Sequence, residues 1–175
     1  MSLKDSYKKY RRSGIFFVIT GPSGVGKTTI MDRTLETDER LEYSISHTTR
    51  SERPSEADGE DYYFVKRGKF VRLQEEGRFL EWAEIYGDYY GTSRDEINRI
   101  KGEGGDPFLD IDVQGAEQLR SDPSVEAVFI FLAPPSLEEL KRRIVSRGAE
   151  SSETREKRLE VARKELDQIP DFDYL

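Results

Sequence analysis

The sequence contains no cysteine and only one histidine in 175 residues. Without cysteine the chain can form no disulfide, no thiolate metal site and no cysteine nucleophile. The single histidine excludes a metal site built from several histidines. No stretch comes near the about 18 apolar residues that a membrane-spanning helix needs. The basic N-terminus lacks the apolar segment of a secretory signal.

The chain also lacks an excess of positive charge: its 35 acidic residues outnumber its 28 basic ones, and the net charge is −7. An acidic chain is a poor electrostatic match for nucleic acid or for an anionic membrane, so we expect neither as a main partner. Small phosphate compounds can still bind in a local basic pocket. We expect a cytoplasmic protein that forms one domain, or one core with inserted subdomains.

The most informative segment is residues 21 to 28, Gly-Pro-Ser-Gly-Val-Gly-Lys-Thr, which match the phosphate-binding loop pattern G-x-x-x-x-G-K-[ST]. The apolar, β-rich run 15–20 before it is typical of a buried strand, and the residues after Lys27 favour a helix. Strand, glycine loop and helix in this order form the context that the motif requires.

The residue types of this loop suit a phosphate. Glycine lets the backbone come close to a ligand, so that N–H groups and the helix N-terminus point at an anion. Lys27 adds a positive charge at the β- and γ-phosphates, and the Thr28 hydroxyl can bind Mg²⁺. We therefore expect nucleotide phosphates to be bound by these residues: Gly21, Ser23, Gly24, Val25, Gly26, Lys27, Thr28 and Thr29.

The hydrophobic pattern predicts strands that alternate with helices along the chain. The predicted strands are residues 15–20, 43–46, 108–112 and 127–132. The predicted helices are residues 27–35, 94–101, 113–120, 137–147 and 153–168. This alternation predicts an α/β fold with a parallel sheet and helices on both faces.

Capping residues support two of the helix starts. Ser93 with Glu96, and Ser136 with Glu139, fit the capping-box pattern. Gly104-Gly105 and Gly148 are typical of helix ends.

Residues 44–92 break the alternation, since they are rich in tyrosine, phenylalanine and glutamate and contain short alternating stretches. We interpret them as a small mixed-sheet insert, and the arginine-rich residues 137–168 as a helical lid. The predicted organisation is a flexible leader, 1–13, and a single domain, 14–175. Its core comprises residues 14–43, 93–136 and 169–175.

The insert contains the outline of a second anion pocket. Arg50 and Arg53 lie three residues apart, and Tyr62 and Tyr90 follow them in the chain. Two guanidinium groups and two phenol hydroxyls can bind a phosphomonoester. Taken alone, the same residues also fit a solvated charged loop with core tyrosines.

The order of these motifs resembles the guanylate kinase family. The resemblance is carried by GPSGVGKTT, SISHTTRSERPSEADGEDYYFV, FLEWAEIYGDYYGTS, FLDIDVQGAEQL and FLAPPSLEELKRRIVSRGAE, which together cover residues 14–168 in the family's order and spacing. Three positions depart from the family pattern: Glu52 stands for proline, Ser55 for glycine and Ala149 for threonine. Residues 173–175 correspond to the start of a further core strand, which a terminal helix follows in the family.

The resemblance implies a P-loop nucleoside-monophosphate kinase fold that transfers the γ-phosphoryl group of Mg-ATP to GMP, and to dGMP, for GMP recycling in purine metabolism. It implies that the GMP phosphate is held by Arg50, Arg53, Tyr62 and Tyr90. It implies that the guanine is read by Ser46, Glu81, Thr92 and Asp112, with Gly91 in the same substrate-binding stretch.

For the transfer itself, the resemblance places Asp110 near Mg²⁺ together with Thr28. It implies that catalysis is carried by Lys27, Arg50, Arg143, Arg147 and Arg158, the last three from the lid. Two alternatives stay open from the residues alone. Asp110 could cap the next helix from the end of its strand, and the basic face that carries Arg143 could be plain solvated surface.

Physical chemistry supports the role that the resemblance implies for Glu81. A carboxylate can accept from the N1–H and the 2-amino group of guanine. Adenine has an acceptor at N1 and no 2-amino group, so it would leave the carboxylate unpaired. His47 is not needed as a general base, because the acceptor phosphate is already anionic and phosphoryl transfer depends on positioning and charge neutralisation.

Two other functions compete with this interpretation. One is a non-catalytic guanylate-kinase-like module that docks phosphopeptides in the pocket of Arg50, Arg53, Tyr62 and Tyr90. The other is a kinase of the same fold that acts on another small phosphate compound. The intact loop at residues 21–28 and the lid arginines argue against the first, and Glu81 with Ser46 and Asp112 argues against the second.

Overall fold

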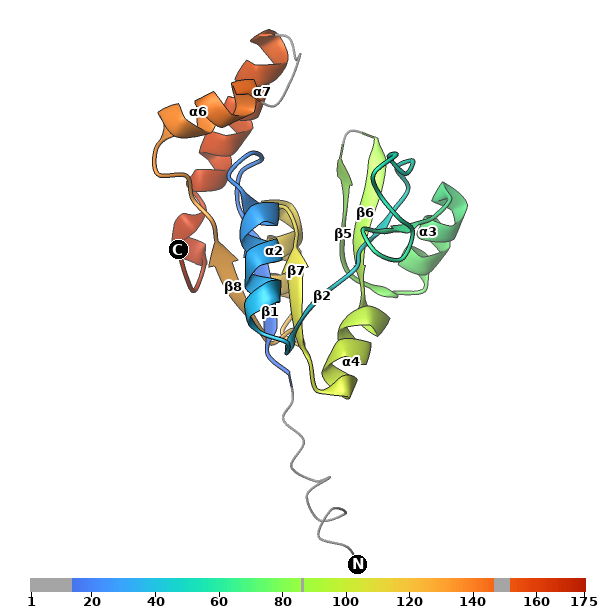
Figure 1. Ribbon diagram of the computed structural model, residues 1–175. Coiled ribbons are helices and arrows are strands. Elements are labelled where there is room, and N and C mark those ends of the chain that lie inside the picture. Colours follow the sequence, from blue (N-terminus) through green and yellow to red (C-terminus); the bar gives the residue numbers. More distant parts are fainter. Residues whose placement is uncertain (1–13, 86, 147–151) are drawn as a thin grey trace, which may run out of the picture. The chain divides into compact units, whose positions relative to one another are not determined.

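The computed structural model describes residues 14–85, 87–146 and 152–175 (Figure 1). The strands are β1 (Phe16–Thr20), β2 (Leu41–Tyr43), β3 (His47–Thr48), β4 (Tyr63–Phe64), β5 (Phe79–Ile85), β6 (Asp88–Ser93), β7 (Asp106–Asp110) and β8 (Ala127–Phe131). The α-helices are α2 (Lys27–Thr37), α3 (Arg67–Glu75), α4 (Arg94–Glu103), α5 (Val113–Ser121), α6 (Leu137–Ser146) and α7 (Ser152–Leu166). A 3₁₀ turn, η2 (Ile169–Asp171), follows. The predicted leader lies outside the described residues.

The described strands form two sheets, with the orders β2-β7-β1-β8 and β4-β3-β6-β5. In the first sheet no two neighbours are consecutive in the chain, and β2 pairs with β7 in parallel, as crossover connections through helices require. In the second sheet β3 runs parallel to β4, whereas β6 runs antiparallel to both β3 and β5. The predicted parallel sheet with helices and the predicted mixed sheet are confirmed.

The chain forms two compact units. The first consists of Asp38–Phe108 with the described residues up to Phe16, and the second of Phe17–Thr37 with Leu109–Leu175. The first unit contains the mixed sheet with α3 and α4. The second contains the glycine loop and the helices α2, α5, α6 and α7. The division into core, insert and lid stays a prediction.

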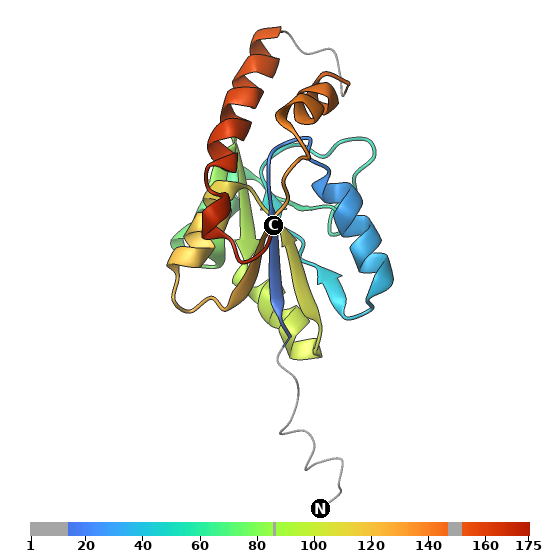
Figure 2. The ribbon, with the colours of Figure 1, turned by 90° about the vertical axis from the view of Figure 1, so that its left-hand side faces the viewer.

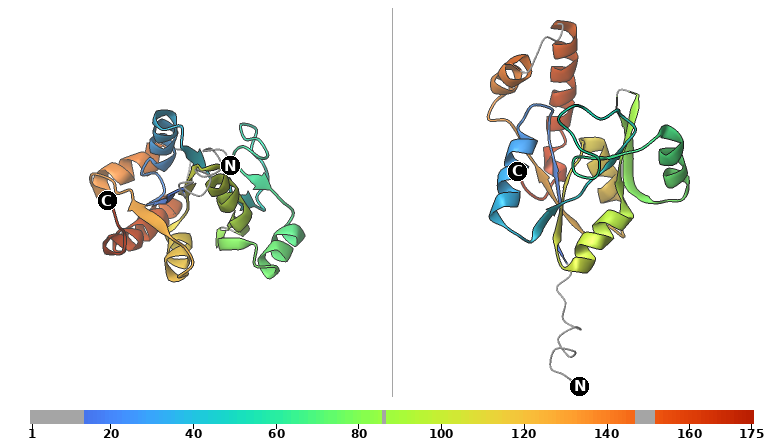
Figure 3. Two further views of the ribbon diagram at one scale, coloured as in Figure 1. Left: turned by 90° about the horizontal axis from the view of Figure 1, so that it is seen from below. Right: turned by 45° about the vertical axis from the view of Figure 1, so that its right-hand side comes forward.

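Helix α3, which the sequence analysis did not predict, packs on one face of the mixed sheet (Figure 3). Its buried Phe70 stacks on Phe79, with ring centroids 4.5 Å apart, and on Tyr89 at 5.3 Å. A Cβ atom at Gly91 would lie only 3.0 Å from the Phe70 ring, so glycine gives this helix room to approach. The helix has a single fully buried anchor, and its weak apolar periodicity explains why it was missed.

Helix α4 begins at the predicted residue and runs two residues beyond the predicted Lys101, up to the predicted terminating glycine. The Ser93 Oγ accepts a hydrogen bond from the backbone N–H of Asp95, 3.2 Å away, and Gly104 ends the helix with a φ of 89°. The predicted role of Ser93 as the N-cap is therefore confirmed. The Glu96 side chain forms an ion pair with Arg99 at 2.9 Å.

One predicted strand is wrong in part. Residues 43–46 were expected to be extended, but β2 ends at Tyr43. The Ser44 N–H still donates to the Phe108 carbonyl at 2.9 Å, whereas the Ser46 carbonyl accepts from Tyr63 of the other sheet. The chain changes sheets within three residues, and a local hydrophobic pattern cannot register such a switch.

The second unit is built around strands β1 and β8, with α2 on one face and α5 on the other (Figures 1 and 3). Val18, Leu109 and Phe131 are fully buried and form part of its core. At the chain's end, Tyr174 makes a parallel bridge with Ile130 of β8. This pairing agrees with the expectation that residues 173–175 begin a strand.

Helices α6 and α7 lie side by side in the second unit (Figure 2). They pack through Leu140, Ile144 and Ala162, with Leu159 against this cluster. The Ser136 Oγ caps α6 by accepting from the Glu139 N–H at 3.1 Å, as predicted. Gly148, the predicted end of α6, lies outside the described residues. No helix in residues 14–85, 87–146 and 152–175 has an apolar stretch long enough to cross a bilayer.

Candidate active site

The glycine loop connects β1 to α2 in the second unit. A Cβ atom at Gly21 would come within 2.2 Å of the Leu132 carbonyl oxygen, and Gly26 has a φ of 111°, so both positions require glycine. Helix α2 begins at Lys27, directly after the loop. The loop N–H groups and the positive end of an 11-residue helix are thus in place for a phosphate, as the motif predicts.

Lys27 lies between the loop and a carboxylate at the end of β7. Its Nζ donates to the Gly21 carbonyl at 2.7 Å and lies 4.0 Å from Asp110 Oδ1. Burial raises the pKa of Asp110 to about 6, although the Lys27 charge opposes the rise; the charge of Asp112 adds to it. A buried carboxylate in need of positive charge is well placed for a cation.

The oxygen atoms of Thr28 and Asp110 are suitable ligands for the magnesium ion that accompanies ATP. Thr28 offers a hydroxyl at the start of α2, and Asp110 offers a carboxylate. Among the described residues no group of three or more histidine or acidic side chains could hold a metal alone. A magnesium ion at this place would therefore depend on phosphate and water oxygens as well, which is its usual mode of binding in kinases.

Helix α6, the first helix of the predicted lid, directs an arginine at the glycine loop. Arg143 Nη1 donates to the Val25 carbonyl at 2.6 Å, and its Nε donates to Glu139 at 2.7 Å. The neighbouring Arg142 also binds Glu139, but its side chain is 76% exposed against 39% for Arg143. The two guanidinium groups lower the pKa of Glu139 to about 2, so its carboxylate stays charged and holds both arginines.

The remaining lid arginines are less well defined. Arg147 lies outside the described residues. Arg158 is half-buried on α7 and takes part in interactions there. Their catalytic assignments stay predictions.

Three of the four residues expected to read guanine meet in the first unit. Glu81 on β5 and Thr92 on β6 are direct partners across the ladder, and the Thr92 hydroxyl donates to Glu81 Oε1 at 2.5 Å. The Ser46 hydroxyl lies 3.5 Å from that of Thr92. The exposures of Glu81, Thr92 and Ser46 are only 5%, 0% and 7%. Glu81 is thus a buried carboxylate whose oxygens suit a ligand that donates hydrogen bonds.

Three of the four residues predicted to hold the GMP phosphate, Arg50, Tyr62 and Tyr90, lie together in the first unit. The Arg50 guanidinium lies 5.5 Å from the centre of the Tyr62 ring, and the rings of Tyr62 and Tyr90 are 5.9 Å apart. The Arg50 side chain is only 15% exposed, which excludes a freely solvated charge at this position. Arg53, by contrast, is mostly exposed.

An acidic residue that the sequence analysis missed lies within this pocket. Glu56 accepts two hydrogen bonds from Arg50, at 2.8 and 2.9 Å, and one from the Arg53 backbone N–H at 2.9 Å. Hydrogen bonding to Glu56 first, and to Tyr90 to a lesser extent, raises the pKa of Arg50, while burial opposes the rise. The sequence signal that could have revealed Glu56 is its spacing, six residues after Arg50 and three after Arg53.

Comparison with known proteins agrees with this geometry. The model of the family described as guanylate kinase matches residues 13–175. The chain belongs to the guanylate kinase family.

Individual relatives give the extent of the similarity. The chain is 46% identical over 164 residues to the guanylate kinase of Lactococcus lactis subsp. lactis, and 47% identical over 165 residues to that of Oceanobacillus iheyensis. Both matches cover 94% of this chain and 80% of the relative. The crystal structure of guanylate kinase from Anaplasma phagocytophilum is similar with a TM-score of 0.73 and 35% identity, over 94% of this chain and 76% of that one. The predicted fold class is thereby confirmed.

Two residues that the family resemblance places at the substrate have clear structural roles. Asp112 caps α5, where its Oδ1 accepts from the Gly115 N–H at 2.8 Å, so the capping role that was considered for Asp110 belongs to Asp112. Gly91 faces the α3 side of the mixed sheet, so only its backbone could contact a substrate on the other side. The substrate assignments of both residues stay predictions.

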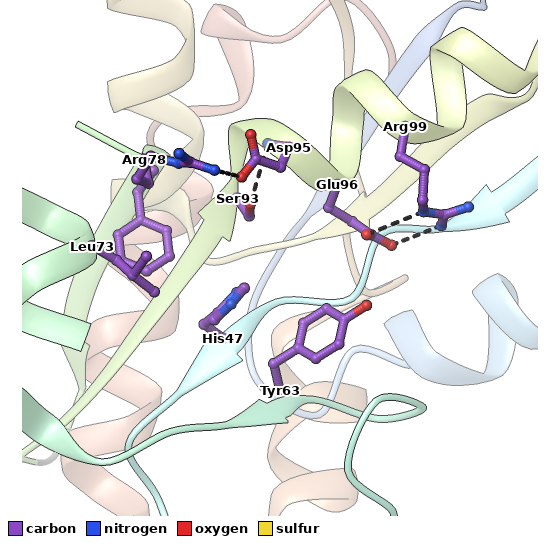
Figure 4. Close-up of a pocket in the computed structure, with 9 residues that line it drawn as sticks. His47, Tyr63, Leu73, Arg78, Ser93, Asp95, Glu96 and Arg99 are labelled. Atoms are coloured by element: carbon purple, nitrogen blue, oxygen red, sulfur yellow. Dashed lines mark hydrogen bonds and ion pairs between the residues drawn. The ribbon is translucent and has the colours of Figure 1, made fainter. Parts of the chain in front are cut away.

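A separate cavity of about 350 Å³ lies in the first unit, away from the residues predicted to read guanine (Figure 4). His47, which lines it, pairs with Gly91, whereas Glu81 pairs with Thr92, and successive strand residues point to opposite faces. The cavity is therefore on the opposite face of the mixed sheet from the guanine-reading set. Two ion pairs also line it: Arg78 with Asp95, and Arg99 with Glu96.

His47 is held in this cavity as a neutral ring. Its Nδ1 is buried without a hydrogen-bond partner in the described part of the chain, and the ring packs 4.9 Å from Tyr63 and 5.5 Å from Phe79. Burial lowers the pKa of His47, and the charge of Lys69 lowers it further, while Glu96 and other nearby carboxylates oppose the change. These contacts support the view that His47 is structural.

We expect the imidazole of His47 to titrate below about 6.5, its ordinary value. Because protonation is harder in the folded than in the unfolded state, stability should fall as the pH drops below that value. The chain has one histidine, so a single imidazole resonance in an NMR titration measures this pKa directly. A pKa at or above 6.5 would contradict the neutral, buried ring.

Proposed function

We propose that this chain transfers the γ-phosphoryl group of ATP to GMP, and also to dGMP, giving ADP and GDP or dGDP. The observation that carries the choice of acceptor is the buried pair of Glu81 and Thr92, next to Ser46. The Glu81 carboxylate accepts from the N1–H and 2-amino groups of guanine, and the Thr92 hydroxyl fixes its orientation. We also propose a cytoplasmic enzyme of purine metabolism that returns GMP to the nucleotide pool.

The transfer needs little covalent participation from the protein. The loop N–H groups and Lys27 hold the ATP phosphates, while Arg50, Arg53 and the two tyrosines hold the GMP phosphate. The attacking oxygen is already anionic, so the transfer is in line and requires no general base. The positive side chains neutralise the repulsion between two phosphate groups, and a closed lid keeps water away from the γ-phosphate.

We propose that Thr28 and Asp110 hold the magnesium ion of Mg-ATP. The ion supplies charge neutralisation at the phosphates when it is bound. Lys27 keeps the Asp110 carboxylate in place at the carboxyl end of β7, 4.0 Å from its own ammonium group.

Arg143 is expected to act on the transferring phosphoryl group, because it already contacts the loop that binds the donor phosphates. Changing Arg143→Ala should lower kcat by about 100-fold or more, since a fixed donor at developing charge contributes on this scale. Arg142→Ala is the matched control, because Arg142 shares the Glu139 partner but points to solvent. Steady-state kinetics of both variants measure the effect; equal kcat values in the two would contradict the assignment.

The alternative is a module that docks phosphopeptides in the pocket of Arg50 and Tyr62 without catalysis. A docking module needs neither a glycine loop with its lysine nor a lid arginine at that loop. The contact between Arg143 and the Val25 carbonyl therefore supports an enzyme.

The deciding experiment measures ADP production from Mg-ATP with a panel of acceptors: GMP, dGMP, IMP, AMP, CMP and UMP. Turnover confined to GMP and dGMP would support both the reaction and the base-reading residues. A folded protein that binds GMP without turnover would favour the docking module. Turnover that prefers AMP or a pyrimidine would favour a kinase for another acceptor.

A further inference from the structure

Glu56 closes a turn that begins at Arg53, one of the two arginines predicted to hold the GMP phosphate. Its backbone N–H donates to the Arg53 carbonyl at 3.0 Å, and its carboxylate accepts from the Arg53 N–H at 2.9 Å, so the turn is closed in both directions. The carboxylate is only 12% exposed although it lies in a loop rich in charges. Its hydrogen bonds are directed at Arg50 and Arg53, so its place in the structure is tied to the pocket.

The hydrogen bonds of Arg50 distinguish two edges of its guanidinium: one is bound to Glu56, and the other faces away from Glu56. Both Nη1 hydrogens are taken, one by the Ser51 carbonyl at 2.7 Å and one by Glu56 at 2.9 Å. Nη2 gives one hydrogen to the other Glu56 oxygen at 2.8 Å. The Nε–H and the second Nη2 hydrogen donate to no carboxylate or backbone carbonyl among the described residues, and the Tyr90 hydroxyl makes a weaker hydrogen bond to this guanidinium than Glu56 does. These two N–H groups form the side edge of the guanidinium, which binds phosphate oxygens in pairs.

Neighbouring rings restrict how the guanidinium can turn. Its Cζ lies 5.5 Å from the Tyr62 ring centre and 5.7 Å from that of Phe64. A planar cation beside two aromatic rings, and anchored at one edge by a carboxylate, has little freedom to rotate. The orientation of the edge that faces away from Glu56 is therefore decided by the anchored one.

We infer that Glu56 is a positioning residue for the acceptor: it anchors one edge of Arg50 so that the other edge faces the GMP phosphate. This inference rests on the proposed function, in which Arg50 holds that phosphate. Glu56 remains in place when the substrate binds, because it is also bonded to the Arg53 backbone. Hydrogen bonding from Arg50 lowers the pKa of Glu56, so the anchor stays charged at neutral pH.

The test compares Glu56→Gln with Glu60→Gln, an exposed glutamate of the same loop. The glutamine keeps the shape of Glu56, but its amide N–H₂ cannot accept from Arg50. We expect the Kd for GMP to rise about 10-fold or more, because charge-assisted hydrogen bonds contribute on that scale. The Ki of guanosine, which lacks the phosphate, and the KM for ATP should stay within about twofold. Glu60→Gln should leave all three constants unchanged.

A double-mutant cycle separates this inference from the proposed function. Arg50→Ala alone should weaken GMP and spare guanosine; if it spares both, the pocket does not hold the GMP phosphate and the proposed function of this site fails. Adding Glu56→Gln to Arg50→Ala should cause little further loss, because the anchor then has nothing to hold.

Two results would overturn the positioning role while leaving the pocket assignment intact. Equal weakening of GMP and guanosine by Glu56→Gln would show a general structural role in the insert. Tighter GMP binding would show that Glu56 competes with the phosphate for Arg50.

Discussion

Replacing Lys27 by alanine is expected to lower kcat by about three orders of magnitude or more while the protein stays folded. The ammonium group is the positive charge that the glycine loop adds to its N–H groups, and it lies within 4.0 Å of the Asp110 carboxylate. Neutralising phosphate charge during transfer is the main task of the protein in phosphoryl transfer, so its loss acts mainly on kcat. The residues predicted to hold the GMP phosphate belong to the other compact unit, so the Kd for GMP should change little.

The measurement is steady-state turnover together with GMP binding and thermal unfolding of the variant. Lys141→Ala, an exposed lysine on α6, provides the control for loss of one positive charge. A near-normal kcat in Lys27→Ala would refute the proposed mechanism. Loss of GMP binding would mean that the substitution had disturbed more than the donor site.

Replacing Glu81 by glutamine is expected to lower kcat/KM for GMP by about 100-fold to 10,000-fold, the range in which hydrogen-bonding sites discriminate between substrates. The carboxylate offers acceptors to both N1–H and the 2-amino group, whereas the amide presents one acceptor and one donor. The substitution keeps the shape of the side chain and its position beside Thr92. ATP affinity should be unaffected, because the donor loop is in the other compact unit.

The selectivity of the Glu81→Gln variant is more informative than its activity. IMP lacks the 2-amino group, so the preference for GMP over IMP should shrink when one acceptor is lost. Glu84→Gln, an exposed glutamate on the same strand, should retain the full preference. A uniform loss with GMP, IMP and ATP would show that Glu81 supports the fold and does not read the base.

The donor half of the site could be predicted from the sequence because its parts are contiguous. Gly21 to Gly26 form one loop between β1 and α2, and Lys27, Thr28 and Thr29 begin that helix, so all the residues predicted to bind the nucleotide phosphates lie within residues 21–29. Helix starts such as those at Ser93 and Ser136 were likewise readable, since a cap involves residues only two or three positions apart. Glu81 was predicted to read the base from the family resemblance and the chemistry of guanine, and that role stays a prediction.

By itself, then, the sequence determined the α/β core, the phosphate loop and the kinds of side chain available for a nucleotide. Only the tertiary structure decided which of them meet. Thr92 binds Glu81 through the pairing of β5 with β6, and a slip of one residue would turn one of them to the opposite face. The hydrogen bonds of Glu56 to Arg50 and of Asp112 to the start of α5 depend on turn geometry that residue type alone does not specify. Helix caps and the phosphate loop involve residues that are close in the chain, so a short segment specifies them. The partners of Glu81, Glu56 and Asp112 depend on strand register and on packing in the folded protein, which no short segment specifies.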